Sequence, residues 1–221
     1  MPPRKRAKTT QKEAEDAASS SPSASDSEAI DRTPLVPYDI TKTHRFIEPG
    51  PVVLVSTRGK AKNARPNLMT MGFHMCVQHE EPPLLGVSIG PWDYSFKALK
   101  ETGECVLAVP GVDLAEKVVD IGNCEGDKVD KWAKFGFTPV EGEEVRAPLV
   151  KEALANFECR VKDKTMVAKY GLWILEVVCA WVNEERDEKK TIHHKGDGTF
   201  VLDGEGLDLQ ERMTKWKEYQ D

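Results

Sequence analysis

The segment from residue 67 to residue 99 carries the most informative pattern in the chain. It reads NLMTMGFH at 67–74, PPLLGVSIG at 82–90 and PWDYSFKAL at 91–99. Imperfect apolar alternation over 68–78 and an apolar run over 84–89 each predict a β-strand, and a proline-containing turn separates the two. The segment therefore indicates two strands that lead directly into a helix.

The amphipathic pattern of 94–101 predicts that short helix, with Asp93 as its N-cap and Gly103 as its C-terminal cap. Its first turn holds Ser95 and Lys97. Because free amides and the helix dipole at a helix N-terminus favour anions, this turn predicts a phosphate site. The carboxylate of Asp93 would compete for the same amides, and the pattern equally fits an ordinary solvated helix face. The residues alone leave both interpretations open.

Further strands are predicted on both sides of this segment, with few helices between them. The predicted strands are 52–57, 104–109, 155–161, 170–182 and 199–202. Helices are predicted at 113–121 and at 127–135 with Asp127 as the cap, one or two helical turns in 149–154, and a final helix with Leu209, Met213 and Trp216. This order favours a mainly β fold with peripheral helices, built as an antiparallel barrel rather than a doubly wound sheet.

The composition indicates one folded domain behind a disordered tail. The chain has 221 residues and a net charge of −6. Residues 1–32 hold a basic cluster at 4–8 and a Ser-rich acidic stretch without apolar periodicity, so we expect them to be disordered. Residues 33–221 should form a single domain with a C-terminal extension from about 184. The mild charge does not favour a nucleic-acid partner, and no apolar run is long enough to cross a membrane.

The cysteines indicate a reducing compartment. There are five, scattered through mostly apolar runs, and no pair has C-x-x-C spacing. Free thiols of this kind are typical of cytosolic or nuclear proteins. We therefore expect a cytoplasmic location, with nuclear import through the basic cluster at 4–8 as a further hypothesis.

Several familiar chemistries have no motif in this chain. The dinucleotide-binding G-x-G-x-x-G, the P-loop and the G-x-S-x-G turn are all absent. His193 and His194 are adjacent and would point to opposite faces of a strand, and no cysteine or second histidine lies at zinc-site spacing. We expect no metal site, and the catalytic residues remain unassigned.

Six short motifs follow one another along the folded part of the chain. They are PVVLVST at 51–57, PNLMT at 66–70, PPLLGVSI at 82–89, YSFKAL at 94–99, GNCEGDKVDKW at 122–132 and FECRV at 157–161. Their order and spacing resemble the flavin reductase-like, or flavoredoxin, family over residues 47–182. The resemblance implies an FMN-binding split β-barrel, usually a homodimer with the flavin near the subunit interface.

The resemblance also implies a set of FMN-binding residues. By position, the isoalloxazine ring would face Asn67, Leu68, Met69 and Thr70, the ribityl chain would lie along Ser88, Ile89 and Gly90, and the phosphate would be held by Ser95 and Lys97. Trp92 would lie near the ring, and Lys131 would contact the phosphate or the flavin. In such a site the flavin performs the hydride chemistry, while the protein sets its orientation and potential.

Two positions depart from the family pattern. Many reductases of this family carry a Gly-Asp-His segment before the long late strand, but residues 167–176 contain no histidine. Glu125 stands where the family often has serine. The sequence thus predicts an FMN-binding flavoprotein, with an NAD(P)H-dependent flavin reductase-like oxidoreductase favoured and a small molecule as electron donor or acceptor. An FMN-binding electron carrier, or an interaction protein with little reductase activity, is the alternative.

Overall fold

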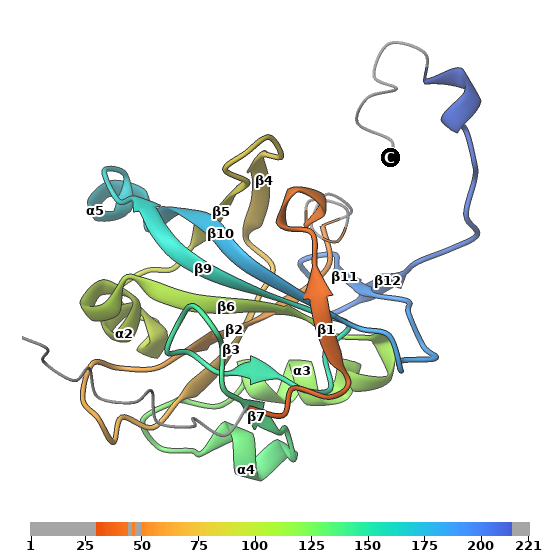
Figure 1. Ribbon diagram of the computed structural model, residues 1–221. Coiled ribbons are helices and arrows are strands. Elements are labelled where there is room, and N and C mark those ends of the chain that lie inside the picture. The colour runs from red at the N-terminus through yellow and green to blue at the C-terminus, as the bar shows by residue number, and fades with distance from the viewer. Residues whose placement is uncertain (1–29, 44–45, 47–49, 214–221) are drawn as a thin grey trace, which may run out of the picture. The chain divides into compact units, whose positions relative to one another are not determined.

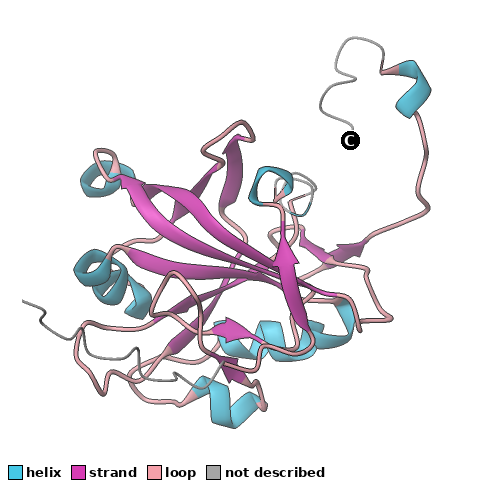
Figure 2. Ribbon diagram, in the orientation of Figure 1, coloured by secondary structure: helices cyan, strands magenta, loops and turns pink. Residues whose placement is uncertain are grey.

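The chain folds around a curled antiparallel sheet with a few short helices at its periphery (Figures 1 and 2). The computed structural model describes residues 30–43, 46 and 50–213. The chain divides into Met1–Ile30 and Asp31–Asp221, and the fold belongs to the second unit. The predicted mainly β, split-barrel class is confirmed.

The main sheet contains eight strands, all paired antiparallel. Seven follow the spatial order β3-β2-β6-β9-β10-β5-β4, and β1 pairs with β10. The strands are β1 (Leu35–Tyr38), β2 (Val53–Thr57), β3 (Asn67–Met71), β4 (His74–Gln78), β5 (Leu84–Ser88), β6 (Glu104–Val109), β9 (Ala155–Asp163) and β10 (Leu172–Asn183). The predictions for β2, β5, β6 and β9 are confirmed, whereas β1 had not been predicted.

The single strand predicted over 68–78 was wrong. The chain breaks at Gly72 and Phe73 into β3 and β4, which lie at opposite ends of the strand order. Two strands joined by two residues can occupy opposite ends only if the sheet curls, and the amide of Ser88 accordingly donates to the Phe73 carbonyl at 3.0 Å. The break therefore closes the half-barrel.

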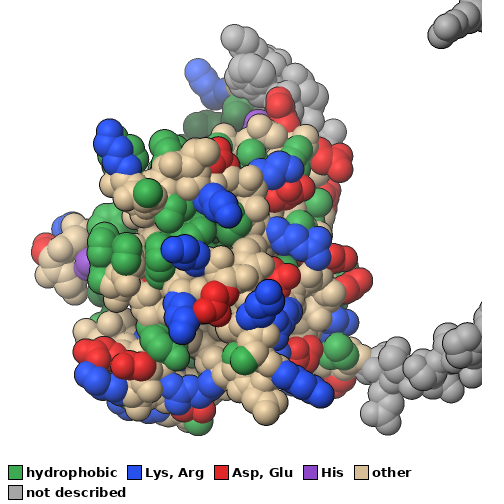
Figure 3. Space-filling model, turned by 90° about the vertical axis from the view of Figure 1, so that its left-hand side faces the viewer, with side chains coloured by type: hydrophobic (Ala, Val, Ile, Leu, Met, Phe, Trp, Pro, Cys, Tyr) green, Lys and Arg blue, Asp and Glu red, His purple; other side chains and the backbone are tan. Residues whose placement is uncertain are grey.

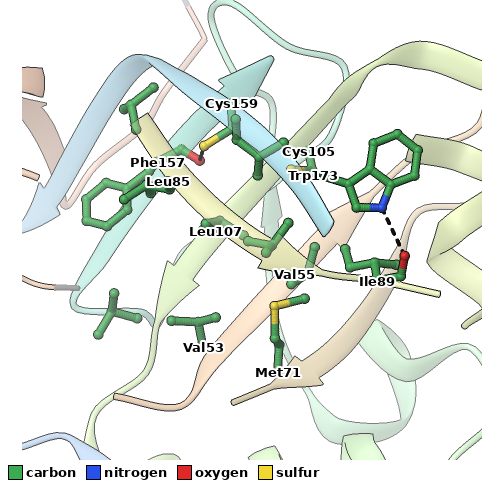
Figure 4. Packing of buried hydrophobic residues seen from close by; sticks show 14 of the residues in the cluster. Val53, Val55, Met71, Leu85, Ile89, Cys105, Leu107, Phe157, Cys159 and Trp173 are labelled. Carbon is green, nitrogen blue, oxygen red and sulfur yellow. Dashed lines mark hydrogen bonds between the residues drawn. The ribbon is translucent and has the colours of Figure 1, made fainter. Parts of the chain in front are cut away.

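The apolar run of β2 is explained by packing on both of its faces. Val53 and Val55 belong to the inner core with Phe157 and Trp173, part of which is drawn in Figure 4. Leu54 faces the opposite way, into a second cluster that includes residues of helices α3 (Ala115–Gly122) and α4 (Lys131–Phe135). A strand buried on both faces reads as a continuous apolar run rather than an alternating one.

Helix α2 (Tyr94–Thr102) confirms the prediction for 94–101. Gly103 ends it in the left-handed conformation (φ 70°), and its amide donates to the Leu99 carbonyl at 2.8 Å. The helical pattern of 113–121 corresponds to a 3₁₀ turn at Val112–Leu114 followed by α3.

The helix predicted from Asp127 to Phe135 was too long. The chain forms turns first, and the shorter α4 is capped by Asp130, whose carboxylate accepts from the Ala133 amide at 3.2 Å. The capping side chain, not the more distant Asp127, sets the start of this helix.

The helical turns predicted in 149–154 were also wrong. Leu149–Val150 forms strand β8, which pairs with β7 (Pro139–Val140). The buried amide of Asn156 accepts from the Val150 amide at 2.7 Å and donates to its carbonyl at 3.0 Å. This side chain takes both main-chain groups that a helical turn would otherwise use.

The long late strand begins two residues later than predicted. Val167–Tyr170 forms a one-turn helix, α5, and Gly171 (φ 65°) turns the chain into β10. After β10, β11 (Ile192–His194) pairs with β12 (Phe200–Leu202), which confirms the strand near 199–202.

The predicted final helix is described only in part. Within the described residues it is a 3₁₀ turn at Gln210–Arg212, and Trp216 lies outside them. Among the described helices, none combines the length and apolar character needed to span a membrane.

Candidate functional site

A cleft of about 760 Å³ opens beside the N-terminal end of α2. Its floor includes Asn67, Met69 and Thr70 of β3. Three segments form its walls: the loop at 59–65, the start of α2 from residue 91, and residues 122–127 after α3. Strands, a helix end and two loops that are distant in sequence thus converge on one hollow of the size typical of small-molecule sites.

A buried polar network joins the floor of this cleft to α2. Ser95 is 1% exposed, and its hydroxyl accepts from the Asn67 side-chain amide at 3.0 Å and from the Thr57 hydroxyl at 3.1 Å. Thr57 and Asn67 are directly paired across β2 and β3. Ser95 therefore ties the ends of two strands to the first turn of the helix.

The N-terminus of α2 has no side-chain cap. Asp93 occupies the N-cap position but makes no capping hydrogen bond to the helix. Its carboxylate instead accepts from the Gly90 amide at 2.8 Å. The expected competition between Asp93 and an anion for the helix amides is thereby reduced, which favours anion binding at this helix end.

The cations of the cleft differ in burial. Lys97 is at the rim with its side chain 85% exposed, 3.9 Å from Glu101. Arg65 donates to the Gly126 carbonyl at 2.7 Å and so connects two walls of the cleft. Lys131 is only 5% exposed. The lining thus offers positive charge both at its mouth and in its interior.

Lys131 is held at the C-terminal end of α3. Its ammonium donates to the Ile121 carbonyl at 3.0 Å, the favourable place for a cation near a helix C-terminus. Burial lowers the pKa of this lysine below its ordinary value, and the nearby Cys124 opposes that shift. The side chain is therefore a fixed structural contact that also borders the cleft.

The structure brings together most of the residues predicted for the site. The cleft is lined by Asn67, Met69, Thr70, Trp92, Lys97 and Lys131, and Ser95 lies directly behind Asn67 and Thr57.

Besides Ser95, four predicted residues are not part of this lining. Leu68 is buried against α3, and Ser88 is exposed on β5. Ile89 is in the inner core, where its carbonyl accepts from the Trp173 indole at 2.9 Å (Figure 4). Gly90 uses its amide for Asp93. Their predicted contacts with the cofactor stay predictions.

Other cleft residues were missed from the sequence. Thr57, Tyr94, Phe96 and Cys124 all contribute to the lining. Thr57 ends a predicted strand and could have been suspected from its polarity, because it follows an apolar run. The remaining three carry no local signal that distinguishes them from ordinary loop or helix residues.

Gly126 shows how closely the walls approach one another. A Cβ at this position would lie 2.5 Å from the Asn67 side-chain oxygen and 2.5 Å from the Tyr94 ring. The family-like turn at 122–132 therefore needs glycine here so that the backbone can meet these two side chains.

The described residues place no histidine in the cleft lining. The Nε2 of His74 is 2.6 Å from the Pro51 carbonyl, and that of His193 is 2.8 Å from Asp203. No cluster of potential metal ligands is found among the described residues either. Neither a replacement for the family histidine nor a metal centre is therefore assigned to the cleft.

The family model of the flavin reductase like domain matches residues 45–200, which include every strand of the main sheet except β1 and every wall of the cleft. The chain belongs to this flavin reductase-like family. An uncharacterized protein of Archaeoglobus fulgidus is 35% identical over 132 residues, which cover 59% of this chain and 74% of the relative.

Solved structures similar to this family member share its fold. The FMN-binding domain of a flavin reductases-like enzyme from Shewanella baltica superposes with a TM-score of 0.71 at 22% identity, covering 79% of this chain and 96% of that one. Flavoredoxin of Desulfovibrio vulgaris gives 0.64 at 25% identity, covering 72% and 89%. The split-barrel architecture is thus common to all three chains.

Proposed function

We propose that this chain binds FMN in the cleft and acts as an NAD(P)H-dependent flavin reductase-like oxidoreductase. The observation that carries the proposal is the uncapped N-terminus of α2, which borders the same cleft as β3 in a member of this family. A planar ring with a phosphorylated side chain needs an apolar slot, a few polar partners and an anion site.

The donors and acceptors of the cleft fit the two ends of FMN. The first amides of α2, together with Lys97, would hold the phosphate. Met69 would offer an apolar surface to the ring, and Asn67 and Thr70 would offer hydrogen bonds. Because the Thr70 hydroxyl already donates to the Val118 carbonyl at 2.5 Å, it would accept from the ligand rather than donate.

Bound FMN supplies hydride and electron transfer, and the chain supplies binding and orientation. The network around Ser95 holds Asn67 in place before any ligand arrives. Preorganised contacts of this kind reduce the entropy lost on binding.

The visible absorption spectrum of the purified full-length protein tests FMN binding. We expect a flavin spectrum, or quenching of FMN fluorescence when the cofactor is added to colourless protein. Protein that is colourless and leaves FMN fluorescence unchanged would contradict the proposal.

An FMN-binding electron carrier without reductase activity is the second candidate. The absence of histidine from the described cleft lining, and from residues 167–176, is the observation that supports this second candidate. Oxidation of NADH or NADPH by the FMN-loaded protein, followed with free FMN as acceptor, distinguishes them. Turnover supports the reductase, whereas FMN binding without turnover supports the carrier.

We also propose that two copies form a homodimer through the outer face of β4. Phe73, Met75 and Val77 are exposed, and Met75 and Val77 meet Leu172 over Gly86. Figure 3, which looks onto the side carrying α2 and α5, shows hydrophobic side chains gathered in one area. An apolar edge strand of this kind is normally covered by a partner.

Light scattering coupled to size exclusion tests the dimer. The wild-type chain should have the mass of two copies, and Met75→Glu should shift it towards one. Val201→Glu, which changes an equally exposed apolar residue on β12, is the matched control. A wild-type mass of one copy would contradict the dimer.

We infer a cytoplasmic location, supported by the five free cysteines of the chain. The basic cluster at 4–8 lies outside the described residues. The relatives named above are archaeal and bacterial, so they give nuclear import no support. Deleting residues 1–30 and comparing localisation tests the import hypothesis.

A further inference from the structure

Beyond the β11–β12 hairpin the chain continues as an exposed segment, residues 204–213, which we name the C-terminal arm. In Figure 1 the arm runs on from β12 as a coil and passes into the 3₁₀ turn at Gln210–Arg212. Every residue in it is exposed. The family match ends at residue 200, so the arm is an addition that follows the matched domain.

The sequence of the arm has the pattern of a strand that is buried on one face. Leu207 is 80% exposed and Leu209 is 48% exposed, and Asp208 lies between them. Because side chains alternate along a strand, an extended arm places both leucines on one face and the aspartate on the other. No proline interrupts the arm, so each of its residues can donate a main-chain hydrogen bond to a neighbouring strand. The arm therefore fits a segment that adds to the edge of a sheet.

Strand β4 offers an edge of matching character. It ends the strand order, and the sheet of the described residues places β5 on one side of it and no strand on the other. Met75 and Val77 are 53% and 47% exposed, and a Cβ on Gly86 of β5 would lie within 3.3 Å of both side chains. A strand added here can form main-chain hydrogen bonds with β4 and set Leu207 and Leu209 beside Met75 and Val77.

The single chain leaves these two surfaces uncovered although they begin close together. The Val52 amide donates to the Ile192 carbonyl of the hairpin at 2.8 Å, and the His74 ring of β4 is 2.6 Å from the carbonyl of the adjacent Pro51. The arm thus starts near β4 of its own chain, yet its leucines and the outer face of β4 both remain exposed. Ten extended residues reach about 33–36 Å, which is long enough to cross to a second copy.

We propose that the arm of each copy adds to the β4 edge of a second copy, so that the two chains of the dimer exchange their C-terminal arms. This inference rests on the proposed homodimer and names the segment that covers its apolar edge. A two-fold pair has two arms and two edges, and the exchange covers all four. The leucines leave water on docking, and the main-chain hydrogen bonds fix the register of the added strand.

Sedimentation velocity over a dilution series of the full-length protein measures the dimer dissociation constant. We expect Leu207→Glu and Leu209→Glu each to raise this constant by about a hundredfold, because burying one leucine is worth about tenfold and each dimer holds two arms. Gln210→Glu, which adds the same charge at an exposed position on the opposite face of the arm, is the matched control. It should change the constant by less than about fivefold.

Mixing two variants shows whether the arm crosses to the other chain. Met75→Glu damages the edge and Leu209→Glu damages the arm, so each variant alone should dimerise weakly. In an equimolar mixture, the intact arm of the first variant can add to the intact edge of the second. We therefore expect the mixed dimer to be about tenfold tighter than either variant alone. No gain on mixing would mean that each arm covers its own edge and would overturn the inference.

The outcomes separate the arm exchange from the proposals beside it. A wild-type chain with the mass of one copy would defeat the homodimer and the exchange together. A wild-type dimer that is weakened by Met75→Glu, but not by Leu207→Glu or Leu209→Glu, would leave the homodimer standing and overturn the exchange alone. The flavin absorbance of the same wild-type samples is recorded separately, and its absence would defeat FMN binding without affecting the exchange.

Discussion

The carboxylate of Asp93 turns away from the helix that it precedes. By accepting from the Gly90 amide, it closes the turn under Trp92 and leaves the first amides of α2 without a side-chain cap. The orientation of the Asp93 side chain therefore affects both the free amides at the start of α2 and the turn that carries Trp92. Capping preferences alone predict the opposite geometry, since aspartate commonly accepts from the helix amides.

Ser95 provides a prediction at the residue scale. Replacing it with alanine leaves the Asn67 amide and the Thr57 hydroxyl without their shared acceptor in a buried place. We expect Ser95→Ala to lower the free energy of unfolding by about 1–3 kcal/mol and to weaken FMN binding, because Asn67 loses its orientation. Urea denaturation and FMN titration measure the two effects.

The control for this variant is Ser88→Ala, at an exposed position outside the cleft. It should change the unfolding free energy by less than about 0.5 kcal/mol. An equal change of the unfolding free energy in the two variants would contradict a stabilising role for the Ser95 hydrogen bonds.

Lys97 provides a second prediction at this scale. Because its side chain is 85% exposed, its attraction for a phosphate is screened by water and salt. We expect Lys97→Ala to weaken FMN binding by less than about fivefold, with the difference shrinking as salt is added. Lys100→Ala, on the same helix but outside the lining, should leave the affinity unchanged. Identical affinities for both variants would place the phosphate elsewhere.

At the scale of elements, Glu158 fastens the 141–147 loop to the sheet. This carboxylate on β9 is fully buried and accepts from the main-chain amides of Glu143, Glu144 and Val145 at 2.6–3.0 Å. The Trp181 indole donates to it at 2.8 Å. Convergent donors of this kind compensate the cost of burying a negative charge.

Glu158→Gln tests this attachment. The side-chain NH₂ group of glutamine would face N–H groups that now donate to the carboxylate, and two donors cannot form a hydrogen bond with each other. We therefore expect the unfolding free energy to fall by about 2–3 kcal/mol. Glu152→Gln is the matched control, since Glu152 accepts the Thr138 amide at 3.1 Å in an exposed place. The control should cost less than about 1 kcal/mol, and a comparable loss at both positions in urea denaturation would contradict the role of burial.

The placement of β3 and β4 also belongs to this scale. Apolar alternation predicted one continuous strand here, because the pattern does not mark the break at Gly72, where a Cβ would meet nothing within 4 Å. The break follows from closure, because β4 can pair with β5 only after the chain leaves the β2 edge. Local periodicity records burial and does not record which strand is the neighbour.

At the scale of the whole molecule, His74 makes stability depend on pH. The ring is largely buried beside the Pro51 carbonyl, and burial lowers its pKa below the ordinary histidine value, with the hydrogen bond opposing this shift. The unfolded chain takes up a proton near pH 6.5, whereas the folded chain resists it. Stability should therefore fall as the pH drops below about 6.5 and level off once the folded ring is also protonated.

Urea denaturation at about pH 8 and about pH 5.5 measures this dependence. His74→Gln should remove part of the loss seen in the wild type, while His194→Gln, on the exposed end of the hairpin, should keep it. A wild-type loss that persists fully in His74→Gln would assign the pH dependence to other groups.

The sequence by itself determined the mainly β class, the start and C-terminal cap of α2, and the order of family motifs. These features depend on short-range physics: apolar periodicity, turn residues and caps act within a few positions of each other. Six of the eleven site residues predicted from the family resemblance line the cleft.

Only the tertiary structure decided how these parts meet. It brought Thr57, Asn67 and Ser95 into one buried network, set Gly126 against Tyr94, and turned Asp93 towards Gly90. It also split 68–78 between the two ends of the sheet. Such contacts arise from the closure of the curled sheet, which joins residues far apart in the chain and leaves no mark on the local pattern around any one of them.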